Sequence, residues 1–356
     1  MFYEVTYFLK HEQYIKRSLE IAQRGIGSTR PNPSVGAVIV VDGQIIGEGF
    51  TSPYGGNHAE VNAIESVEDK ELLKNATIYV TLEPCSHFGK TPPCSNLIIR
   101  SGIKKVVIGC VDSNSLVSGK GIERLIGSGI EVIVGVLEEE CKYHHRRFFT
   151  FHTKERPYIL LKWAESQDGF LAPLKRNEQA PVWITNEISR QLVHQWRSQE
   201  HAILVGTNTV LEDNPKLTIR NWEGENPVRI VIDRELKISK NLNVYDQSVK
   251  TIFIYSHELM NQVEDRREIV FEKANFYQPL AIQICDILYK HKIQSLIVEG
   301  GAKTLQTFID ENLWDEARIF TGAVIFSEGV KRPEFFQTSY SEEYIGEDVL
   351  KKYMND

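Results

Sequence analysis

The chain has few of the features that mark secreted, membrane or nucleic-acid-binding proteins. Its 356 residues include five cysteines, an odd and sparse set that does not suit a disulfide framework. It has no apolar run of the roughly 18 residues needed to span a membrane, and its N-terminus lacks the basic-then-apolar layout of a signal peptide. The net charge of −7 argues against a basic surface for nucleic acid. We therefore expect a cytoplasmic protein with no membrane or nucleic-acid partner.

What is present is the composition of an ordinary globular protein, long enough for two domains. Hydrophobic residues make up 42% and charged residues 25%. The first half alternates predicted strands with predicted helices, the strands at 35–41, 77–81, 105–110 and 131–136 and the helices at 12–24, 58–67, 95–101, 122–128 and 137–152. Asp42-Gly43 predicts a hairpin that returns through 45–47.

The second half alternates in the same way after a break at Arg156-Pro157, because a residue before proline is pushed out of helix. Predicted strands lie at 158–163, 202–206, 228–233, 251–255 and 295–299, and predicted helices at 187–199 and 303–312. This order predicts α/β domains with mostly parallel sheets covered by helices. We expect two of them, at residues 1–153 and 154–356.

Three residues of the first half have the types and positions of a catalytic zinc site. His58 begins a predicted helix, Cys85 follows a predicted strand, and Cys94 ends a Pro- and Gly-rich loop. One imidazole and two thiolates bind Zn²⁺ and leave a fourth position for water, which the metal activates for hydrolysis. Glu60 lies two residues after His58, where it can act as a proton shuttle. His-x-Glu followed by Pro-Cys is the pattern of zinc-dependent nucleobase deaminases.

Two alternatives stay open for these residues. A structural zinc site would need a fourth Cys or His, and His87, between the two cysteines, is the nearby candidate. A chance association of His-x-Glu with two cysteines is the other. The remaining cysteines carry no site: Cys110 and Cys285 lie in apolar runs typical of buried positions, and Cys141 lies in a polar stretch.

Longer stretches around these residues resemble a known family. Arg30-Pro31-Asn32-Pro33-Ser34-Val35-Gly36, His58-Ala59-Glu60 and the segment from Thr81 through Pro84-Cys85 to Pro93-Cys94 are similar to the deaminase half of the bifunctional riboflavin-biosynthesis deaminase–reductases. The eight residues between the cysteines differ from the Cys-x-x-Cys of nucleic-acid-editing deaminases. The resemblance implies a cytidine-deaminase-like three-layer domain, with Asn32 at the pyrimidine and Glu60 as proton shuttle.

The second half carries no Rossmann fingerprint, because no Gly-x-Gly-x-x-Gly follows a predicted strand. Val298-Glu299-Gly300-Gly301 is the best phosphate-binding candidate, since a strand there runs into glycines and a helix. A tight turn alone would explain the two glycines equally well.

The family resemblance extends over this half, through the segments at 161–169, 183–185, 206–215, 217–220, 227–233 and 298–301. It implies a dihydrofolate-reductase-like α/β domain that binds NADPH. The NADPH residues it implies are Ala164, Trp183, Thr209, Asp213, Gly300 and Gly301. The residues implied for the phosphorylated substrate are Arg197, Leu217, Arg220 and Glu299. Two arginines suit a phosphate dianion in a net-negative protein.

Acid–base chemistry at the sugar is expected from Lys162, Asp213 and Glu299, among which the sequence does not divide the roles. Three positions depart from the family: Glu165 replaces a small residue, Gln167 replaces a leucine and Pro181 replaces a substrate-binding serine. The resemblance implies zinc-dependent hydrolytic deamination of a diaminopyrimidinone ribosyl phosphate, followed by NADPH-dependent reduction of the ribosyl group to ribityl. We also expect a homo-oligomer. A non-catalytic second half and a nucleic-acid-editing protein are the competing hypotheses.

Overall fold

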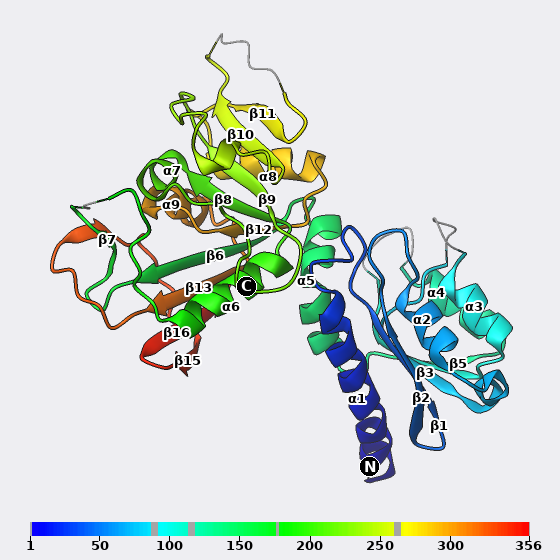
Figure 1. Cartoon of the computed structure of the whole chain (residues 1–356). Helices are drawn as coiled ribbons and strands as arrows, with labels where there is room; N and C mark the ends of the chain where they lie inside the picture. The colour runs from blue at the N-terminus through cyan, green and yellow to red at the C-terminus, as the bar shows by residue number, and fades with distance from the viewer. Residues whose placement is uncertain (1, 87–91, 113–117, 176–177, 260–264, 356) are drawn as a thin grey trace. The chain divides into compact units, whose positions relative to one another are not determined.

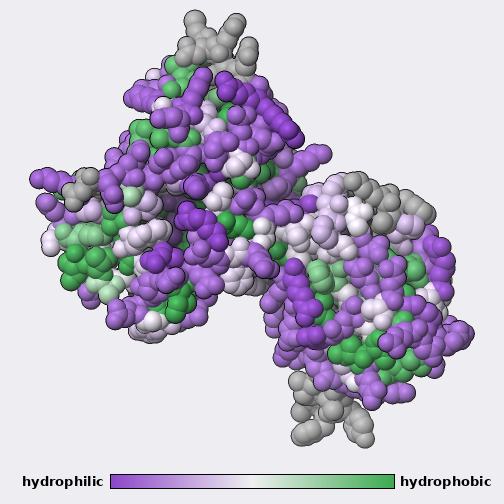
Figure 2. Space-filling view, viewed as in Figure 1, coloured by the Kyte–Doolittle hydropathy of each residue, from purple (hydrophilic) through white to green (hydrophobic). Residues whose placement is uncertain are grey.

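The structure, a computed structural model, describes residues 2–86, 92–112, 118–175, 178–259 and 265–355. The chain divides into two compact units, Met1–Lys154 and Glu155–Asp356, each with its own sheet (Figure 1). Figure 2 shows a mostly hydrophilic face on which apolar residues form separate small groups. In the described part of the chain, no helix combines the length and apolar character that a membrane crossing requires.

The first unit is built on a five-stranded sheet with strand order β2-β1-β3-β4-β5. β1 (Gly36–Val41) is antiparallel to β2 (Gln44–Phe50) and β3 (Thr77–Leu82), whereas β3, β4 (Lys105–Cys110) and β5 (Glu131–Val134) are parallel to one another. The predicted hairpin is confirmed. Asp42 and Gly43 both have positive φ, 50° and 83°, as the tight turns that suit hairpin twist require.

Helices cover both faces of this sheet, so the unit has the expected three layers (Figure 1). α1 (Phe2–Ala22) and α5 (Glu138–Thr153) lie on one face, and α2 (Ala59–Ser66), α3 (Cys94–Ser101) and α4 (Lys120–Gly127) on the other. α1 begins earlier than the predicted 12–24, because residues 2–11 contain no glycine or proline to end a helix. Cys110 is buried as predicted, and Cys141 is buried as well.

A buried carboxylate fixes the start of α4 to the end of β3. Glu83 is 4% exposed. Its Oε1 accepts hydrogen bonds from the backbone of Gly121 and Ile122 at 2.9 and 3.3 Å, and its Oε2 from Gly119 and Asp112 at 3.0 and 3.3 Å. Glu83 therefore satisfies N–H groups that a helix N-terminus leaves without intrahelical partners. It also ties α4 to the loop that carries Cys85.

Replacing Glu83 by alanine is expected to lower the free energy of unfolding of the first unit by roughly 2–4 kcal/mol, because buried N–H groups lose their acceptor. All five tryptophans lie at or after Trp163, so their emission reports the second unit, whereas circular dichroism reports both. Urea denaturation followed by both probes should show the loss in circular dichroism alone. The exposed Glu123→Ala on the same helix is the control, and equal stability of the two variants would contradict the anchoring role.

The second unit is built on a nine-stranded sheet with strand order β11-β10-β9-β8-β12-β6-β13-β16-β15. The strands from β11 to β13 run parallel, as predicted, and β16 and β15 are antiparallel additions at one edge. The bounds are β6 Tyr158–Glu165, β8 Ala202–Gly206, β9 Val228–Ile232, β10 Thr251–Ser256, β11 Ile269–Ala274, β12 Ser295–Val298, β13 Glu316–Thr321, β15 Ser341–Ile345 and β16 Asp348–Met354. A separate ribbon pairs β7 (Phe170–Pro173) with β14 (Gly329–Lys331).

Two apolar cores lie on the two faces of this sheet. α8 (Leu280–Lys290) and α9 (Ala302–Asp310) contribute to one core, which includes Cys285 as predicted. α6 (Glu187–Gln199) and α7 (Thr207–Asp213) contribute Val193, Trp196 and Val210 to the other. Because the parallel strands end at one edge of the sheet, the residues that follow β8, β9 and β12 meet there, where α/β sheets bind their ligands.

Candidate functional site

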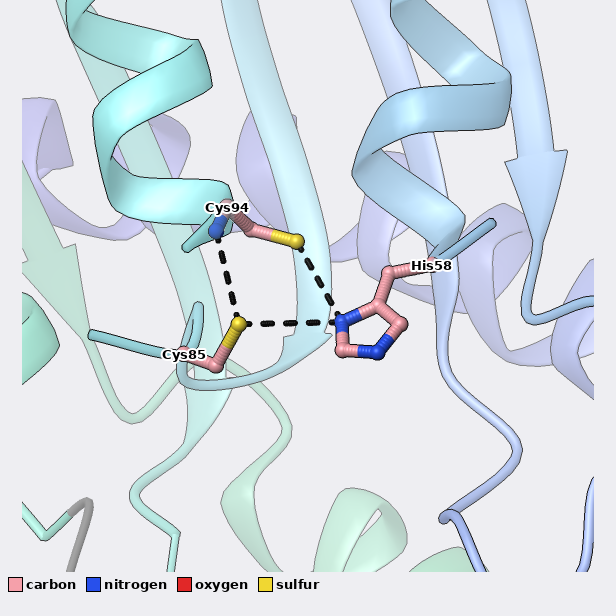
Figure 3. Close-up of side chains that lie close together, drawn as sticks. All are labelled: His58, Cys85 and Cys94. Atoms are coloured by element: carbon pink, nitrogen blue, oxygen red, sulfur yellow. Dashed lines mark hydrogen bonds between the residues drawn. The ribbon is translucent and has the colours of Figure 1, made fainter. Parts of the chain in front are cut away.

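His58, Cys85 and Cys94 form one cluster in the first unit (Figure 3). Nδ1 of His58 lies 3.6 Å from Sγ of Cys85 and 3.4 Å from Sγ of Cys94, and the ligand atoms of all three lie within 4.8 Å of one another. His58 is the residue before α2, and Cys94 is the first residue of α3. Cys85 is held against α3 because its carbonyl accepts from the Ser95 amide at 3.2 Å.

The donor set of this cluster fits a zinc ion. Thiolate sulfur and imidazole nitrogen are the ligands that zinc prefers, and three of them leave a position open. All five cysteines are free thiols, so no disulfide competes for these sulfurs. The Cys94 side chain, together with its amide at 3.4 Å, hydrogen-bonds to Cys85 Sγ and lowers the pKa of the Cys85 thiol well below its usual value. Cys94 is the first residue of α3, where the helix N-terminus favours thiolate, whereas its hydrogen bond with Cys85, followed by burial, raises the pKa of its own thiol.

Glu60 lies beside the cluster, in the first turn of α2. It is 4% exposed, and burial, followed by the charge of Cys85, raises the pKa of its carboxyl to about 7. Its carboxylate is within hydrogen-bonding reach of the Cys94 thiol. A carboxyl group in this position is able to hold or release a proton at the open side of a metal ion.

The other two residues expected here have different outcomes. Asn32 lies in the loop between Gly25 and β1. Its backbone N–H donates to the Thr29 carbonyl at 3.0 Å, and Thr29 Oγ1 donates to the backbone carbonyl of Asn32 at 3.0 Å. Its contact with a pyrimidine stays a prediction. His87, the alternative fourth ligand, lies outside the described residues.

The second unit contains a cavity of about 1160 Å³ at the carboxyl ends of its parallel strands. Nine residues expected at the reductase site line it: Lys162, Ala164, Trp183, Arg197, Thr209, Asp213, Arg220, Glu299 and Gly301. They come from β6, α6, α7 and the connecting loops, and are spread over about 140 residues of sequence. The fold therefore collects into one cavity residues that the sequence shows only as separate segments.

Glu299 is the centre of a buried ionic cluster in this cavity. Nε and Nη2 of Arg197 each lie 2.7 Å from one of its carboxylate oxygens, and Nζ of Lys162 lies 3.9 Å away. Lys162 is close because Val298 pairs with Leu161, which places the next residues of the two strands side by side. Burial alone would raise the pKa of Glu299, but Arg197, helped by Lys162, lowers it to about 2. The carboxylate is therefore charged at neutral pH.

Arg197 is thus oriented by Glu299 through two nitrogens, and its Nη1 lies 3.5 Å from the Thr218 carbonyl. Burial lowers the pKa of Lys162, against the attraction of Glu299, which raises it. Burial and then the charge of Arg197 lower the pKa of Arg220 as well. These effects describe a pocket in which three cations face one carboxylate, an arrangement suited to a phosphate group.

The residues expected at a nicotinamide cofactor form another part of the lining. Trp183 is 57% exposed, and the Arg190 guanidinium lies 4.8 Å from the centre of its ring. Gly301 caps α9 with φ 65°, a conformation that favours glycine, and a Cβ there would lie 3.3 Å from Thr209 Oγ1. The first turn of α9 also lines the cavity, so its amides are available to an anionic ligand.

Among the described residues, four positions singled out from the sequence do not line this cavity: Leu217, Gly300, Glu165 and Pro181. Leu217 is 3% exposed and belongs to an apolar core, and Gly300 packs so closely on β8 that a Cβ would lie 2.3 Å from Val205 Cα. Their ligand roles stay predictions. Glu165 accepts a hydrogen bond from Trp163 Nε1 at 2.8 Å, which accounts for an acid at this position. Pro181 is exposed.

Sequence reasoning missed two side chains of α6 that line the cavity. Arg190 donates to the Thr185 carbonyl at 2.7 Å and stacks on Trp183, and His194 is 5% exposed. With Val193 and Arg197 they recur every three or four residues, the spacing that places side chains on one helix face. Because Arg197 was a candidate from sequence, this helical spacing could have indicated that Arg190 and His194 share its face.

Comparison with known proteins identifies relatives of both units. Residues 9–110 match the cytidine and deoxycytidylate deaminase zinc-binding region, and residues 157–342 match the RibD C-terminal domain. The riboflavin biosynthesis protein RibD of Aquifex aeolicus is 42% identical over 356 aligned residues, covering 95% of this chain and 97% of that protein. RibD of Escherichia coli is 36% identical, covering 88% and 87%.

Solved structures agree with the sequence relatives. A diaminohydroxyphosphoribosylaminopyrimidine deaminase/5-amino-6-(5-phosphoribosylamino)uracil reductase from Thermotoga maritima superimposes with a TM-score of 0.88 at 39% identity, covering 98% of this chain and all of that chain (100%). RibD of Acinetobacter baumannii superimposes with a TM-score of 0.85 at 29% identity, covering 98% and 99%. Both likenesses extend over both units.

Proposed function

The chain belongs to the RibD family of riboflavin-biosynthesis proteins, and on that premise we propose that its two units catalyse consecutive reactions on one phosphorylated pyrimidine. The first is a cytidine-deaminase-like unit and the second a dihydrofolate-reductase-like one. We assign residues 1–153 to hydrolytic deamination of the diaminopyrimidinone ribosyl phosphate. We assign residues 154–356 to NADPH-dependent reduction of the ribosyl group to ribityl.

The observation that carries the deaminase assignment is the His58–Cys85–Cys94 cluster with Glu60 buried beside it. These three residues would hold zinc, which supplies an activated water when bound. Glu60 would move the proton between that water and the leaving amino group. Glu83 supports the site indirectly, because it holds the loop before Cys85 to α4.

The reductase assignment rests on the cationic cavity of the second unit. Arg197 and Arg220 would bind the phosphate of the substrate, and Glu299 would orient Arg197 through their two hydrogen bonds. Because Glu299 is held ionised, Lys162 is the better donor of a proton to the sugar as its ring opens. NADPH, when bound along Ala164, Trp183, Thr209, Asp213 and the Gly300–Gly301 turn, supplies the hydride.

The proposed function is tested by following both products of the two reactions with the full chain. With the diaminopyrimidinone substrate and NADPH, we expect ammonia release and NADPH oxidation in equal amounts. A chelator should abolish ammonia release, and zinc should restore it, because hydrolysis needs the metal. NADPH oxidation with the already deaminated substrate should survive the chelator. Absence of ammonia release from the zinc-loaded protein would exclude the deaminase.

The same assay separates the remaining hypotheses. A non-catalytic second unit would release ammonia without oxidising NADPH, but Lys162, Asp213 and Glu299 are all present around one cavity. A nucleic-acid-editing protein would need a basic groove with aromatic platforms, which the net charge of −7 disfavours. A homo-oligomeric assembly and a cytoplasmic location stay predictions from the sequence.

A further inference from the structure

His194 occupies a position in the reductase cavity to which neither the sequence motifs nor the proposed reaction assigns a role. It lies on α6 one turn before Arg197, and both side chains line the cavity. Residues three apart on a helix are neighbours on its surface. The side chain is only 5% exposed, so its surroundings rather than bulk solvent determine its hydrogen bonding.

The imidazole of His194 has an unsatisfied polar atom. Its Nδ1 is buried and has no hydrogen-bond partner within the part of the chain that the structure describes. Buried polar atoms nearly always have a partner, and an unpaired donor is rarer than an unpaired acceptor. The tautomer with its proton on Nε2 is therefore favoured. Because the ring lines the cavity, the donor that it offers to a ligand there is this Nε2 proton.

The charged groups around His194 are mostly cations. Arg197, Arg220 and Lys162 are cations and Glu299 is the one anion among the groups that influence it. Burial, followed by the charges of Arg197 and Arg220, lowers the pKa of His194 to about 4, so the ring is neutral. Three positive charges and one negative charge give the cluster a net charge of +2, which would balance the −2 charge of a phosphate dianion. A neutral N–H beside such cations adds a directional donor to a phosphate oxygen.

We propose that His194 is a further substrate-contacting residue of the reductase site, and that its Nε2–H donates a hydrogen bond to the phosphate of the phosphorylated sugar. This inference rests on the proposed function of the cavity. It divides phosphate recognition between the charges of Arg197 and Arg220 and a neutral donor on the same helix face as Arg197.

Three substitutions of His194 test which ring atom matters. Glutamine places an amide N–H near the position of Nε2, asparagine places its amide near Nδ1, and leucine has neither. With the deaminated, phosphorylated substrate, His194→Leu and His194→Asn should raise KM about tenfold or more, and His194→Gln by clearly less, because a hydrogen bond to a charged group is lost in the first two. With the dephosphorylated substrate the three variants should match the wild type. The exposed Gln191→Leu, on the same helix, is the control.

The outcomes distinguish this contact from a structural role and from failure of the proposed function. Equal KM increases for both substrates, or normal kinetics in all three variants, would overturn the phosphate contact. A fall in thermal stability with unchanged KM would show that the ring only packs, and would overturn it as well. If the wild type releases ammonia but never oxidises NADPH, the reductase function itself fails and this inference fails with it.

Discussion

Glu60→Gln is expected to reduce ammonia release by roughly 10³-fold or more while zinc content stays near one per chain, because glutamine retains the shape of glutamate but cannot accept and return a proton. Glu60 lies in the first turn of α2, two residues after His58, and is 4% exposed. Among the described residues, Glu60 is the buried acid in the first turn of α2, beside the cluster. Its loss should therefore leave the metal ligands intact and remove the proton transfer.

Parallel measurements of metal, ammonia and NADPH make this result specific. NADPH oxidation with the deaminated substrate should be unchanged, because the reductase residues lie in the second unit. Glu68→Gln, an exposed substitution just after the same helix, should behave as wild type in all three measurements. If Glu60→Gln loses its zinc, the carboxylate is needed to hold the site together. Ammonia release within a few-fold of wild type would exclude it as the proton carrier.

The first site was predictable because each of its residues lies at a boundary that sequence reveals. His58 and Cys94 are at helix starts, and Cys85 follows a buried strand. Such positions meet at one edge of an α/β sheet, so residue type and boundary together predict a cluster. The sequence did not reveal the role of Glu83, because its four partners are backbone amides of a loop and helix about 30–40 residues away.

The edge of the second sheet was not predicted, for a physical reason. Two of the first three residues of β13 are charged, and Arg318 Nε donates to Glu316 Oε1 at 2.6 Å, so this end of the strand is buried although it is not apolar. β15 carries two adjacent acids and β16 two adjacent lysines, which pair across the strands, such as Lys352 with Glu343 at 3.0 Å. Hydrophobic periodicity cannot detect strands that are stabilised by ion pairs. α8, in contrast, has buried apolar residues at helical spacing, Ala281, Ile284, Cys285 and Leu288, which indicate a helix from sequence alone.

The reductase cavity could be predicted only as a set of residues. Arg197 and Glu299 are 102 positions apart, and nothing in the local sequence of either indicates that they pair. The parallel register of β6 and β12 brings Lys162 to the same carboxylate, and this proximity too depends on tertiary structure. The structure therefore changes the meaning of Glu299, from one of three interchangeable acid–base candidates to the anion that orients two cations.

Glu299→Gln should accordingly disable the second reaction alone. The amide leaves Arg197 and Lys162 without their buried counter-charge, and breaking such a pair costs about 3–5 kcal/mol of unfolding free energy. Misplacing a substrate-binding group by about 1 Å costs on the order of 10² in rate, so kcat/KM for the deaminated substrate should fall by at least that factor. Ammonia release should be unaffected. The measurements are NADPH oxidation at saturating cofactor and denaturation followed by tryptophan emission.

A hydrogen-bonded carboxylate elsewhere in the same unit separates orientation from stability. Glu272 Oε1 lies 2.7 Å from Nε2 of His291, and neither residue lines the cavity, so Glu272→Gln should lower stability with normal NADPH oxidation. Glu299→Asp keeps the charge but shortens the reach to Arg197, and should recover part of the stability and little of the rate. A Glu299→Gln protein that is folded and reduces its substrate within threefold of wild type would show that Arg197 and Lys162 need no anion between them. In that case the cations alone would position the phosphorylated sugar, and Asp213 would become the remaining carboxylate candidate for acid–base chemistry in the cavity.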